Sequence, residues 1–360
     1  METIGDRLKK LRNEYKFTQK QLGDYLDFDQ SHIAKLENNK RNLRTDTLDD
    51  LCKLYNCSEE YIINGYEDYV KPNLNYRSNI RSLDLNTVAK MNPIIKNMTY
   101  LTKFSKEHEN DYRSIYNSKL TMDVFSRANN CRRIWNIGEY DPIDIISVCL
   151  NKFNNITIVF FVANQNVSGS SIPVNGEWII FVNSNHSLGR QRFTIAHELY
   201  HLLFGNNEYV NCSVNSNTKE ELEADEFASY LLMSEGALLN YQLECGIENW
   251  NLDSILACEQ YFQISRDAMI TRLGKLNKKD NFRIPKYTTK IKYNAKKRGF
   301  SENLYVPYSK DKNLVMGSYI RLTQKAYDDE KITKGRKDEL LRDAYYYDFL
   351  NNKNMEDLFA

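Results

Sequence analysis

The stretch from Arg192 to Gly205 holds the residues of this chain that are best spaced for chemistry. It contains the pattern H-E-x-x-H, with His197 and His201 four positions apart. On a helix, at about 100° per residue, the two imidazoles lie within roughly 40° of each other on one face. Two neutral imidazoles so placed can bind one Zn²⁺. Glu198 projects beside that face, where a carboxylate can accept a proton from a water polarised by the metal.

The residues around this pattern favour a helix. Thr194 is the expected N-cap, and Gly205 follows the last expected turn. An apolar stripe runs between them, made of Ile195, Leu199, Leu202 and Leu203. The alternative is a helix with two ordinary histidines and an exposed glutamate, and a third metal ligand distinguishes the two interpretations.

A catalytic zinc site needs three protein ligands, and the acid-rich stretch 219–233 offers the third. Its apolar spacing predicts a helix, and its acids gather in the first half, where the helix dipole favours them. Glu221 and Asp225 lie at i and i+4, on one face. Glu221 can therefore bind the metal while Asp225 accepts the outer N–H of a ligating histidine. Glu223 is the alternative ligand, and the pairing with Asp225 favours Glu221.

Together these segments resemble the ImmA/IrrE family of metallopeptidases. The resemblance covers the run from Arg192 to His201 and the later E-x-x-x-D that leads into F-A-x-x-L-L-M. It implies that His197, His201 and Glu221 bind Zn²⁺ and that Glu198 is the general base. The family cleaves repressor-type transcription factors, so the resemblance also implies a protein substrate of that type.

Two positions depart from the usual family pattern. Members commonly have glycine where this chain has Tyr200, and proline where it has Ser234. Neither departure removes a ligand, although the Tyr200 ring is expected to narrow the cleft.

Composition limits the class of protein. The chain has 360 residues, 41% of them hydrophobic, and a net charge of +1. That length allows two or three domains, and the near-zero charge confines any nucleic-acid contact to a local patch. We find no apolar window long enough for a membrane span and no signal peptide. The seven cysteines form no C-x-x-C pair. We therefore expect reduced thiols, a cytoplasmic location and no membrane partner.

Residues 1–66 show short helical patterns separated by turns. The run T-Q-x-x-L-G from Thr18, the run I-x-x-L-E-N-N-K from Ile33 and the run S-x-x-Y-I-I-N-G from Ser58 closely resemble the Cro-like (XRE) phage repressors. The resemblance implies a helix-turn-helix fold whose third helix, capped by Asp29, enters the major groove.

The resemblance also implies the DNA contacts. The positions expected at DNA are Gln19, Gln30, Ser31, Lys35, Lys40 and Arg41. Gln30, Ser31 and Lys35 match base-reading positions, and the other three match phosphate contacts. Asn39 replaces the usual glycine, and asparagine tolerates a left-handed helix end. Such modules bind double-stranded operators as dimers, so a homodimer is expected. The alternative is a helix-turn-helix used only for protein contact.

The chain as a whole is predicted to be multi-domain. The expected parts are an all-α helix-turn-helix head at 1–66, a linker and connecting helix at 67–110, an α+β zincin-like peptidase domain at 111–280, and a small basic and helical C-terminal module at 281–360. The connecting helix could be a dimerisation arm or a strut. Residues 156–162 and 178–183 are predicted strands. The basic segment 275–298 could contact nucleic acid or form the solvated face of an edge strand.

These patterns predict a DNA-binding transcriptional regulator with a zinc-dependent endopeptidase domain. It would cleave a repressor-type protein, or itself, to relieve repression in stress or mobile-element control. The alternative is a DNA-binding regulator or antitoxin whose peptidase-like domain acts as a sensor or interaction module without proteolysis. The two functions differ in the expected effect of two substitutions. If Glu198→Gln leaves the phenotype in cells intact while Lys35→Ala destroys it, the peptidase interpretation is wrong.

Overall fold

The computed structural model describes residues 2–66, 85–105, 116, 122–205, 210–213, 218–276, 290–308 and 314–344, with only the backbone given for 210–213 and for residue 276. Within these ranges, none of the helices has both the length and the apolar composition that a membrane crossing requires. Most of the expected linker after residue 66 lies outside the described residues.

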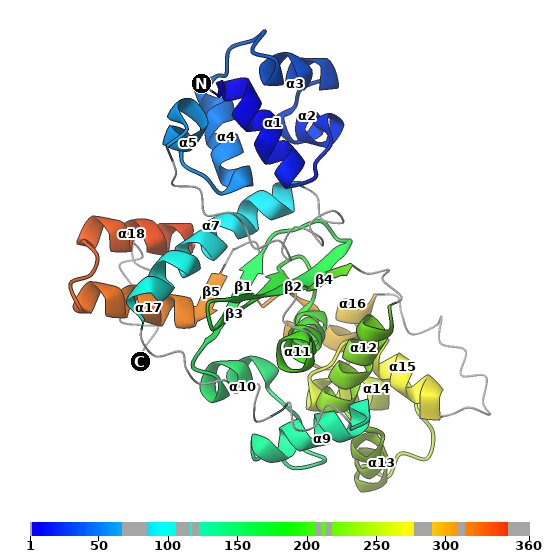
Figure 1. Ribbon diagram of the computed structural model, residues 1–360. Coiled ribbons are helices and arrows are strands. Elements are labelled where there is room, and N and C mark those ends of the chain that lie inside the picture. The colour runs from blue at the N-terminus through cyan, green and yellow to red at the C-terminus, as the bar shows by residue number, and fades with distance from the viewer. Residues whose placement is uncertain are drawn as a thin grey trace.

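The N-terminal head is a bundle of short helices (Figure 1). They are α1 (Ile4–Glu14), α2 (Gln19–Leu26), α3 (Gln30–Glu37), α4 (Thr45–Tyr55) and α5 (Glu59–Asn64). Thr3 and Thr18 both form capping boxes, and Asp29 caps α3 by accepting a hydrogen bond from the His32 backbone N–H. Asn39 adopts φ 56°, the left-handed conformation expected there.

Helix α7 (Leu85–Leu101) connects the head to the rest of the molecule, followed by a short 3-10 turn, η2 (Thr102–Phe104). One continuous apolar core includes the inner residues of the head, the buried side of α7 and one face of the central sheet. The Asn92 side-chain amide also donates to the carbonyl oxygen of Leu54 on α4, at 2.6 Å. Helix α7 therefore acts as a strut packed on both sides (Figure 1).

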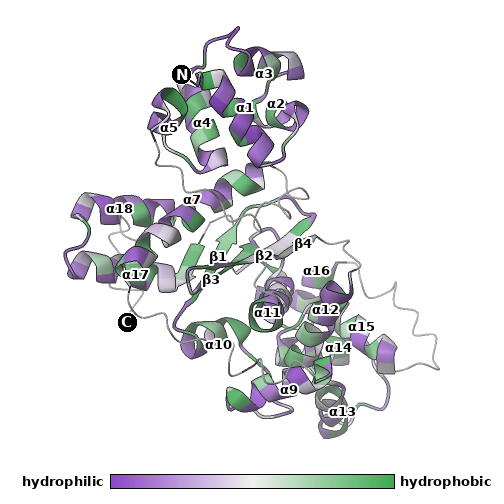
Figure 2. Ribbon diagram, in the orientation of Figure 1, coloured by the Kyte–Doolittle hydropathy of each residue, from purple (hydrophilic) through white to green (hydrophobic). Residues whose placement is uncertain are grey.

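The described strands form one mixed sheet of five, in the order β4-β2-β3-β1-β5. They are β1 (Ile156–Phe161), β2 (Val167–Val174), β3 (Glu177–Asn183), β4 (Val210–Ser213) and β5 (Leu314–Gly317). Strands β1 and β3 run parallel, and every residue in both is buried. Their apolar composition is visible in Figure 2. Both predicted strands are confirmed, whereas β2 was not predicted.

Alternate residues of the sheet enter two different cores. Phe161 and Phe181 face α7, and Phe160 and Ile180 face the opposite side. On that opposite side lie the helices α9 (Val124–Ile134), α10 (Ile145–Lys152), α11 (Leu188–Phe204), α12 (Lys219–Leu232), α13 (Glu235–Glu244), α14 (Leu252–Phe262) and α15 (Arg266–Leu276). The prediction of Thr194 as the N-cap is wrong, because α11 begins at Leu188 and Ser187 is its N-cap. The earlier turns are stabilised by Leu188 and Phe193, which pack against the apolar core on this side of the sheet.

The C-terminal part returns to the sheet. It contains α16 (Ile291–Lys297), η4 (Asn303–Tyr305), α17 (Ser318–Asp328) and α18 (Lys334–Asp343), with β5 before α17. Residues 291–297 are helical, so this part of the basic segment is not an edge strand. Strand β5 pairs antiparallel with β1, so the segment expected as a separate module supplies one strand of the central sheet.

Candidate metal centre

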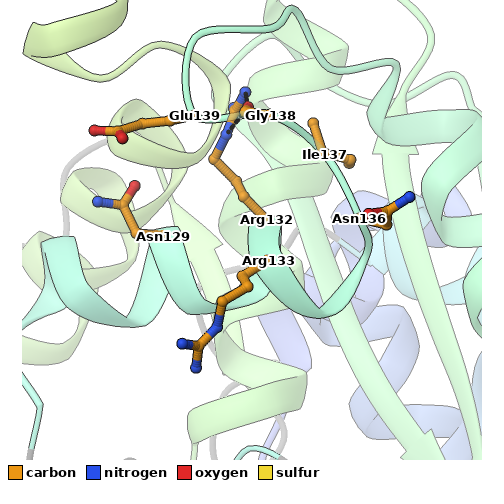
Figure 3. Close-up of a pocket in the computed structure, with 7 residues that line it drawn as sticks. All are labelled: Asn129, Arg132, Arg133, Asn136, Ile137, Gly138 and Glu139. Atoms are coloured by element: carbon orange, nitrogen blue, oxygen red, sulfur yellow. Dashed lines mark hydrogen bonds between the residues drawn. The ribbon is translucent and has the colours of Figure 1, made fainter.

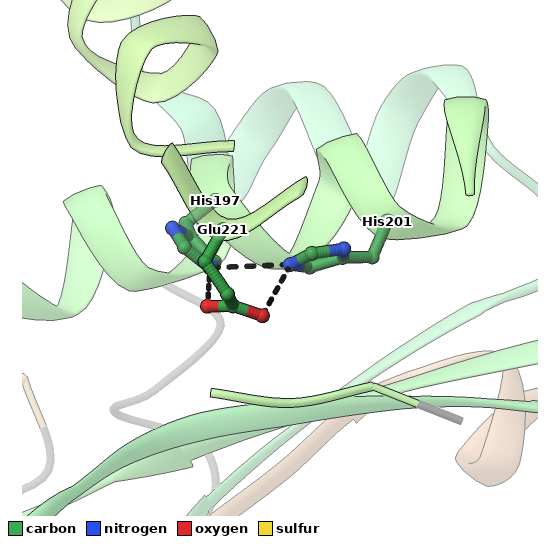
Figure 4. A group of neighbouring side chains, drawn as sticks. All are labelled: His197, His201 and Glu221. Carbon is green, nitrogen blue, oxygen red and sulfur yellow. Dashed lines mark hydrogen bonds and ion pairs between the residues drawn. The ribbon is translucent and has the colours of Figure 1, made fainter. Parts of the chain in front are cut away.

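Three side chains from two helices converge beside the central sheet (Figure 4). His197 and His201 come from α11 and Glu221 comes from α12, and all three are buried. One ligand atom from each lies within 4.8 Å of the others. The sequence analysis singled out six histidines and acids on α11 and α12, and three of them are thus brought into one donor group.

The spacing of these donors fits a tetrahedral zinc ion. The Nε2 atoms of the two histidines are 3.2 Å apart. The Glu221 carboxylate oxygens lie 3.3 Å from His197 Nε2 and 3.5 Å from His201 Nε2. Ligands at 2.0–2.1 Å from a tetrahedral Zn²⁺ are separated from each other by about 3.3–3.4 Å. The nitrogen and oxygen donors therefore suit this metal in both type and separation.

Carboxylates also surround the outer sides of the two imidazoles. Asp225 Oδ1 lies 2.8 Å from His197 Nδ1, and Glu220 Oε1 lies 3.5 Å from His201 Nδ1. A proton held on the outer nitrogen leaves Nε2 free to face the donor group. Burial disfavours protonation of His197, yet its bonds to Asp225 and Glu221 raise its pKa to about 10. The site thus favours a positive charge, which a bound metal ion also supplies.

Glu198 stands beside this group in the wall between α11 and the sheet. Its side chain is completely buried. A Cβ atom at Gly169 of β2 would lie 3.4 Å from Glu198 Oε1 and 2.4 Å from the methyl carbon of Thr194. The missing side chain at Gly169 therefore allows β2 to approach α11 next to Glu198.

Glu223, the alternative third ligand, is engaged elsewhere. Its Oε2 accepts a hydrogen bond of 2.6 Å from the hydroxyl of Tyr200. That hydroxyl also accepts a hydrogen bond of 2.8 Å from Arg127 Nη1. The structure thus brings Glu221, and not Glu223, to the histidines. The contact with Arg127 on α9 escaped the sequence analysis because 73 positions separate Arg127 from Tyr200.

A cavity of about 570 Å³ adjoins the metal-site helices. Asp225 belongs to both its wall and the metal site. The cavity is lined from α11, α12 and α15 and the residue before α15, by Arg190, Phe193, Leu222, Asp225, Glu226, Ser229, Ser265, Asp267, Ala268, Thr271 and Lys275. This mixture of apolar, acidic and basic groups could accept a side chain from a substrate.

A second cavity, of about 400 Å³, lies at the end of α9 (Figure 3). Arg132 points from α9 toward the loop that contains Gly138 (Figure 3). Its guanidinium donates to the carbonyl oxygens of Gly138, Asp141 and Leu231. Because these bonds tie the loop to α9 and α12, the role of Arg132 is structural.

The positions expected at DNA lie on the surface of the head, except for Gln19, which is partly buried. Gln30, Ser31, Lys35, Lys40 and Arg41 are exposed. Ser31 Oγ donates to the capping residue Asp29 at 2.7 Å. Gln19 donates from its side-chain amide to the buried Glu37 carboxylate, at 2.9 Å.

Glu37 also receives two hydrogen bonds from Arg12, at 2.5 and 3.1 Å. This contact joins α1 to α3 in the interior of the head. The sequence analysis did not predict this contact, because it used Glu37 only as part of the motif that resembles the phage repressors.

Comparisons with known proteins agree with the two regions of the structure. Residues 146–274 match the IrrE N-terminal-like domain family, Peptidase_M78, and residues 5–68 match a helix-turn-helix domain family. The chain therefore combines an XRE-type helix-turn-helix domain with an IrrE-like peptidase domain, as the sequence resemblance implied.

One curated relative is the HTH-type transcriptional regulator ImmR of Bacillus subtilis (strain 168). It is 34% identical over 71 residues, which are 20% of this chain and 55% of that protein. The chain thus spans about half the length of the curated relative that it matches.

Proposed function

We propose that this protein is a DNA-binding regulator that uses a zinc peptidase site to cleave a protein of the repressor type, or itself. The observation that carries the proposal is the buried group of His197, His201 and Glu221 within the IrrE-like domain. Support for the regulatory role comes from the helix-turn-helix domain and from a relative named as a transcriptional regulator.

Each residue at the centre has a role in this proposal. His197, His201 and Glu221 hold the metal, and Asp225 orients the His197 ring through Nδ1. A bound zinc ion supplies Lewis-acid polarisation of the scissile carbonyl. Glu198 takes the proton of the attacking water and delivers it to the leaving amine. Its complete burial favours this role, because proton transfer then occurs away from bulk water.

The edge of the sheet offers a place for an extended substrate. Strand β3 precedes α11 in the chain, but it is paired with β1 on one side and with β2 on the other, so neither of its edges can bind a further strand. Strand β4 is the outermost strand on one side, and within the described residues it pairs with β2 alone. We propose that a substrate segment adds to β4 by main-chain hydrogen bonds and places one side chain in the cavity beside Asp225.

The head is proposed to bind double-stranded operator DNA through α3, as one half of a homodimer. Gln30, Ser31 and Lys35 would read bases, and Lys40 and Arg41 would contact phosphates. Gln19 has two amide protons, of which the bond to Glu37 uses one. Glu37 therefore holds Gln19 in a position from which it can donate the second proton to a phosphate.

Mass spectrometry tests the peptidase proposal. The zinc-loaded full chain is mixed with candidate repressor-type proteins, with and without a chelator, and the Glu198→Gln variant serves as a matched control. Cleavage that requires both the metal and Glu198 supports the proposal. A purified protein that binds no stoichiometric metal contradicts the proposal. Regulation in cells that is retained in Glu198→Gln but lost in Lys35→Ala also contradicts it.

A further inference from the structure

We propose that Tyr200 is a positioning residue for the metal centre. Its hydroxyl joins Arg127 on α9 to Glu223 on α12, and thereby fixes the helix that carries Glu221 against the helix that carries the two histidines. The inference rests on the proposed zinc site, and it concerns a residue to which the mechanism above gives no role.

The Tyr200 hydroxyl uses both of its hydrogen-bonding capacities. It accepts a proton from Arg127 Nη1 at 2.8 Å and donates its own to Glu223 Oε2 at 2.6 Å. Arg127 Nη1 and Glu223 Oε2 are themselves 3.7 Å apart, which closes a triangle of contacts. Tyr200 is only 3% exposed, so water competes little for these bonds.

The triangle grips α12 on the side opposite the metal centre. Glu223 lies midway in sequence between Glu221 and Asp225, so it is roughly 160° around the helix from each of them. Glu221 and Asp225 contact the histidines on one side, and Glu223 contacts Tyr200 on the other. Contacts on two opposite sides restrict both rotation of α12 about its axis and translation along α11.

This restriction matters because a metal ion tolerates only a small range of distances between its donor atoms. The two Glu221 oxygens lie 3.3 and 3.5 Å from the two histidine nitrogens, and a rotation of α12 that moves the Glu221 carboxylate changes these distances. The aromatic contacts of Tyr200 do not depend on its hydroxyl. Its ring centroid is 5.4 Å from that of Phe204 and 5.4 Å from that of Phe227. A phenylalanine at this position therefore retains the packing and removes only the hydroxyl contacts.

The test compares Tyr200→Phe with Tyr230→Phe in the full chain. Tyr230 is a suitable control because it lies on α12, the helix that carries Glu221 and Glu223, and because its ring, like that of Tyr200, contacts an arginine, with the Arg272 guanidinium 4.6 Å from the ring centre. Zinc affinity is measured by competition with a chelator, and site geometry by the visible absorption of the Co²⁺-loaded protein. We expect Tyr200→Phe to weaken zinc binding about tenfold and to alter the Co²⁺ spectrum. Tyr230→Phe should leave both unchanged.

A second pair of variants covers the case in which Tyr200→Phe folds poorly. Glu223→Gln keeps an acceptor oxygen for the Tyr200 hydroxyl and should retain the wild-type spectrum, whereas Glu223→Ala should reproduce the loss. Wild-type affinity and spectrum in both Tyr200→Phe and Glu223→Ala overturn the inference, as do equal losses in Tyr200→Phe and Tyr230→Phe. If the wild-type chain itself binds no zinc, the proposed function fails instead, so the two failures are distinguishable.

Discussion

Asp225 bonds to the outer nitrogen of His197 although its own side chain is 58% exposed. Removal of this acceptor frees the ring to turn and lowers the basicity of its metal-binding nitrogen. We therefore expect Asp225→Ala to weaken zinc binding by about 10- to 100-fold, and Asp225→Asn, which retains an acceptor oxygen, to weaken it less. Chelator competition measures both values. Equal affinity in the wild type and in Asp225→Ala would show that Asp225 has no part in the centre.

His186 gives the fold a dependence on pH. Burial, together with the nearby positive charge of Arg190, lowers its pKa from the ordinary value of 6.5 to about 4. The folded state therefore favours the neutral ring. The stability due to His186 is fully present above about pH 6.5 and is lost as the pH falls toward 4. Between pH 7.5 and pH 5 the loss should be about 2 kcal/mol.

Urea unfolding at pH 7.5 and pH 5 measures this effect. In His186→Gln, which cannot be protonated, the free energy of unfolding should fall less between the two pH values than in the wild type. An equal fall in both proteins would exclude His186 as a source of acid sensitivity.

At the residue scale, local spacing was sufficient where the partners lie on one helix. The i, i+4 pairs of His197 with His201 and of Glu221 with Asp225 could be read directly from the sequence. The partners of Glu223 and Glu37 could not, because Tyr200 and Arg12 lie on other helices and only the tertiary fold brings them close.

At the scale of elements, β2 shows why sequence patterns failed. Its sequence, V-S-G-S-S-I-P-V, is rich in residues with low strand propensity, so local pattern does not indicate a strand there. Strand β2 forms nevertheless because it pairs with β3 on one side and with β4 on the other. Gly169 is required there by the close approach of α11, a reason that local propensity does not contain.

This close approach yields a prediction for Gly169→Ala. The new Cβ would lie 2.4 Å from Thr194 Cγ2 on α11 and 2.7 Å from the carbonyl oxygen of Phe181 on β3, so β2 must shift relative to both neighbours. We expect a loss of about 1–3 kcal/mol in the free energy of unfolding. Displacement of Glu198 should also reduce peptidase activity, by up to about 100-fold.

Gly274→Ala is the matched control, because a Cβ at that helical position meets no atom within 4 Å. It should be neutral or slightly stabilising. A Gly169→Ala variant as stable and as active as Gly274→Ala would contradict the proposed role of the β2–α11 contact.

At the scale of the whole molecule, the order of a helical head followed by an α+β region was predictable from motifs and apolar runs. The return of the chain to the sheet was not predictable. Strand β5 has only four residues, L-V-M-G, and its pairing with β1 joins positions more than 150 apart. The use of the connecting helix as a strut also had to come from the structure, because its apolar faces fit a dimer arm equally well.

The two proposed activities should separate experimentally, because α3 lies at the end of the molecule away from α11 (Figure 1). Removal of zinc by a chelator should stop proteolysis and lower the Tm, since a ligand that binds the folded state stabilises it. The affinity for operator DNA should not change. Lys35→Ala should have the opposite pattern, with DNA binding weakened by about 1–3 kcal/mol and proteolysis of free substrate retained. Fluorescence anisotropy and a cleavage assay measure the two activities. Loss of DNA affinity on chelation would show that the two sites are coupled.

The shared apolar core around α7 sets a limit on how this protein can be recombined. A chimaera joined directly after residue 66 would replace the α4 surface on which α7 packs, including the Leu54 carbonyl oxygen that accepts a hydrogen bond from Asn92. A donor head with its own operator preference must therefore bring a compatible α7, or keep the α4 surface on which α7 rests. Exchange of operator specificity in such proteins, by evolution or by engineering, should proceed more readily by changes within α3 than by transplanting the whole head.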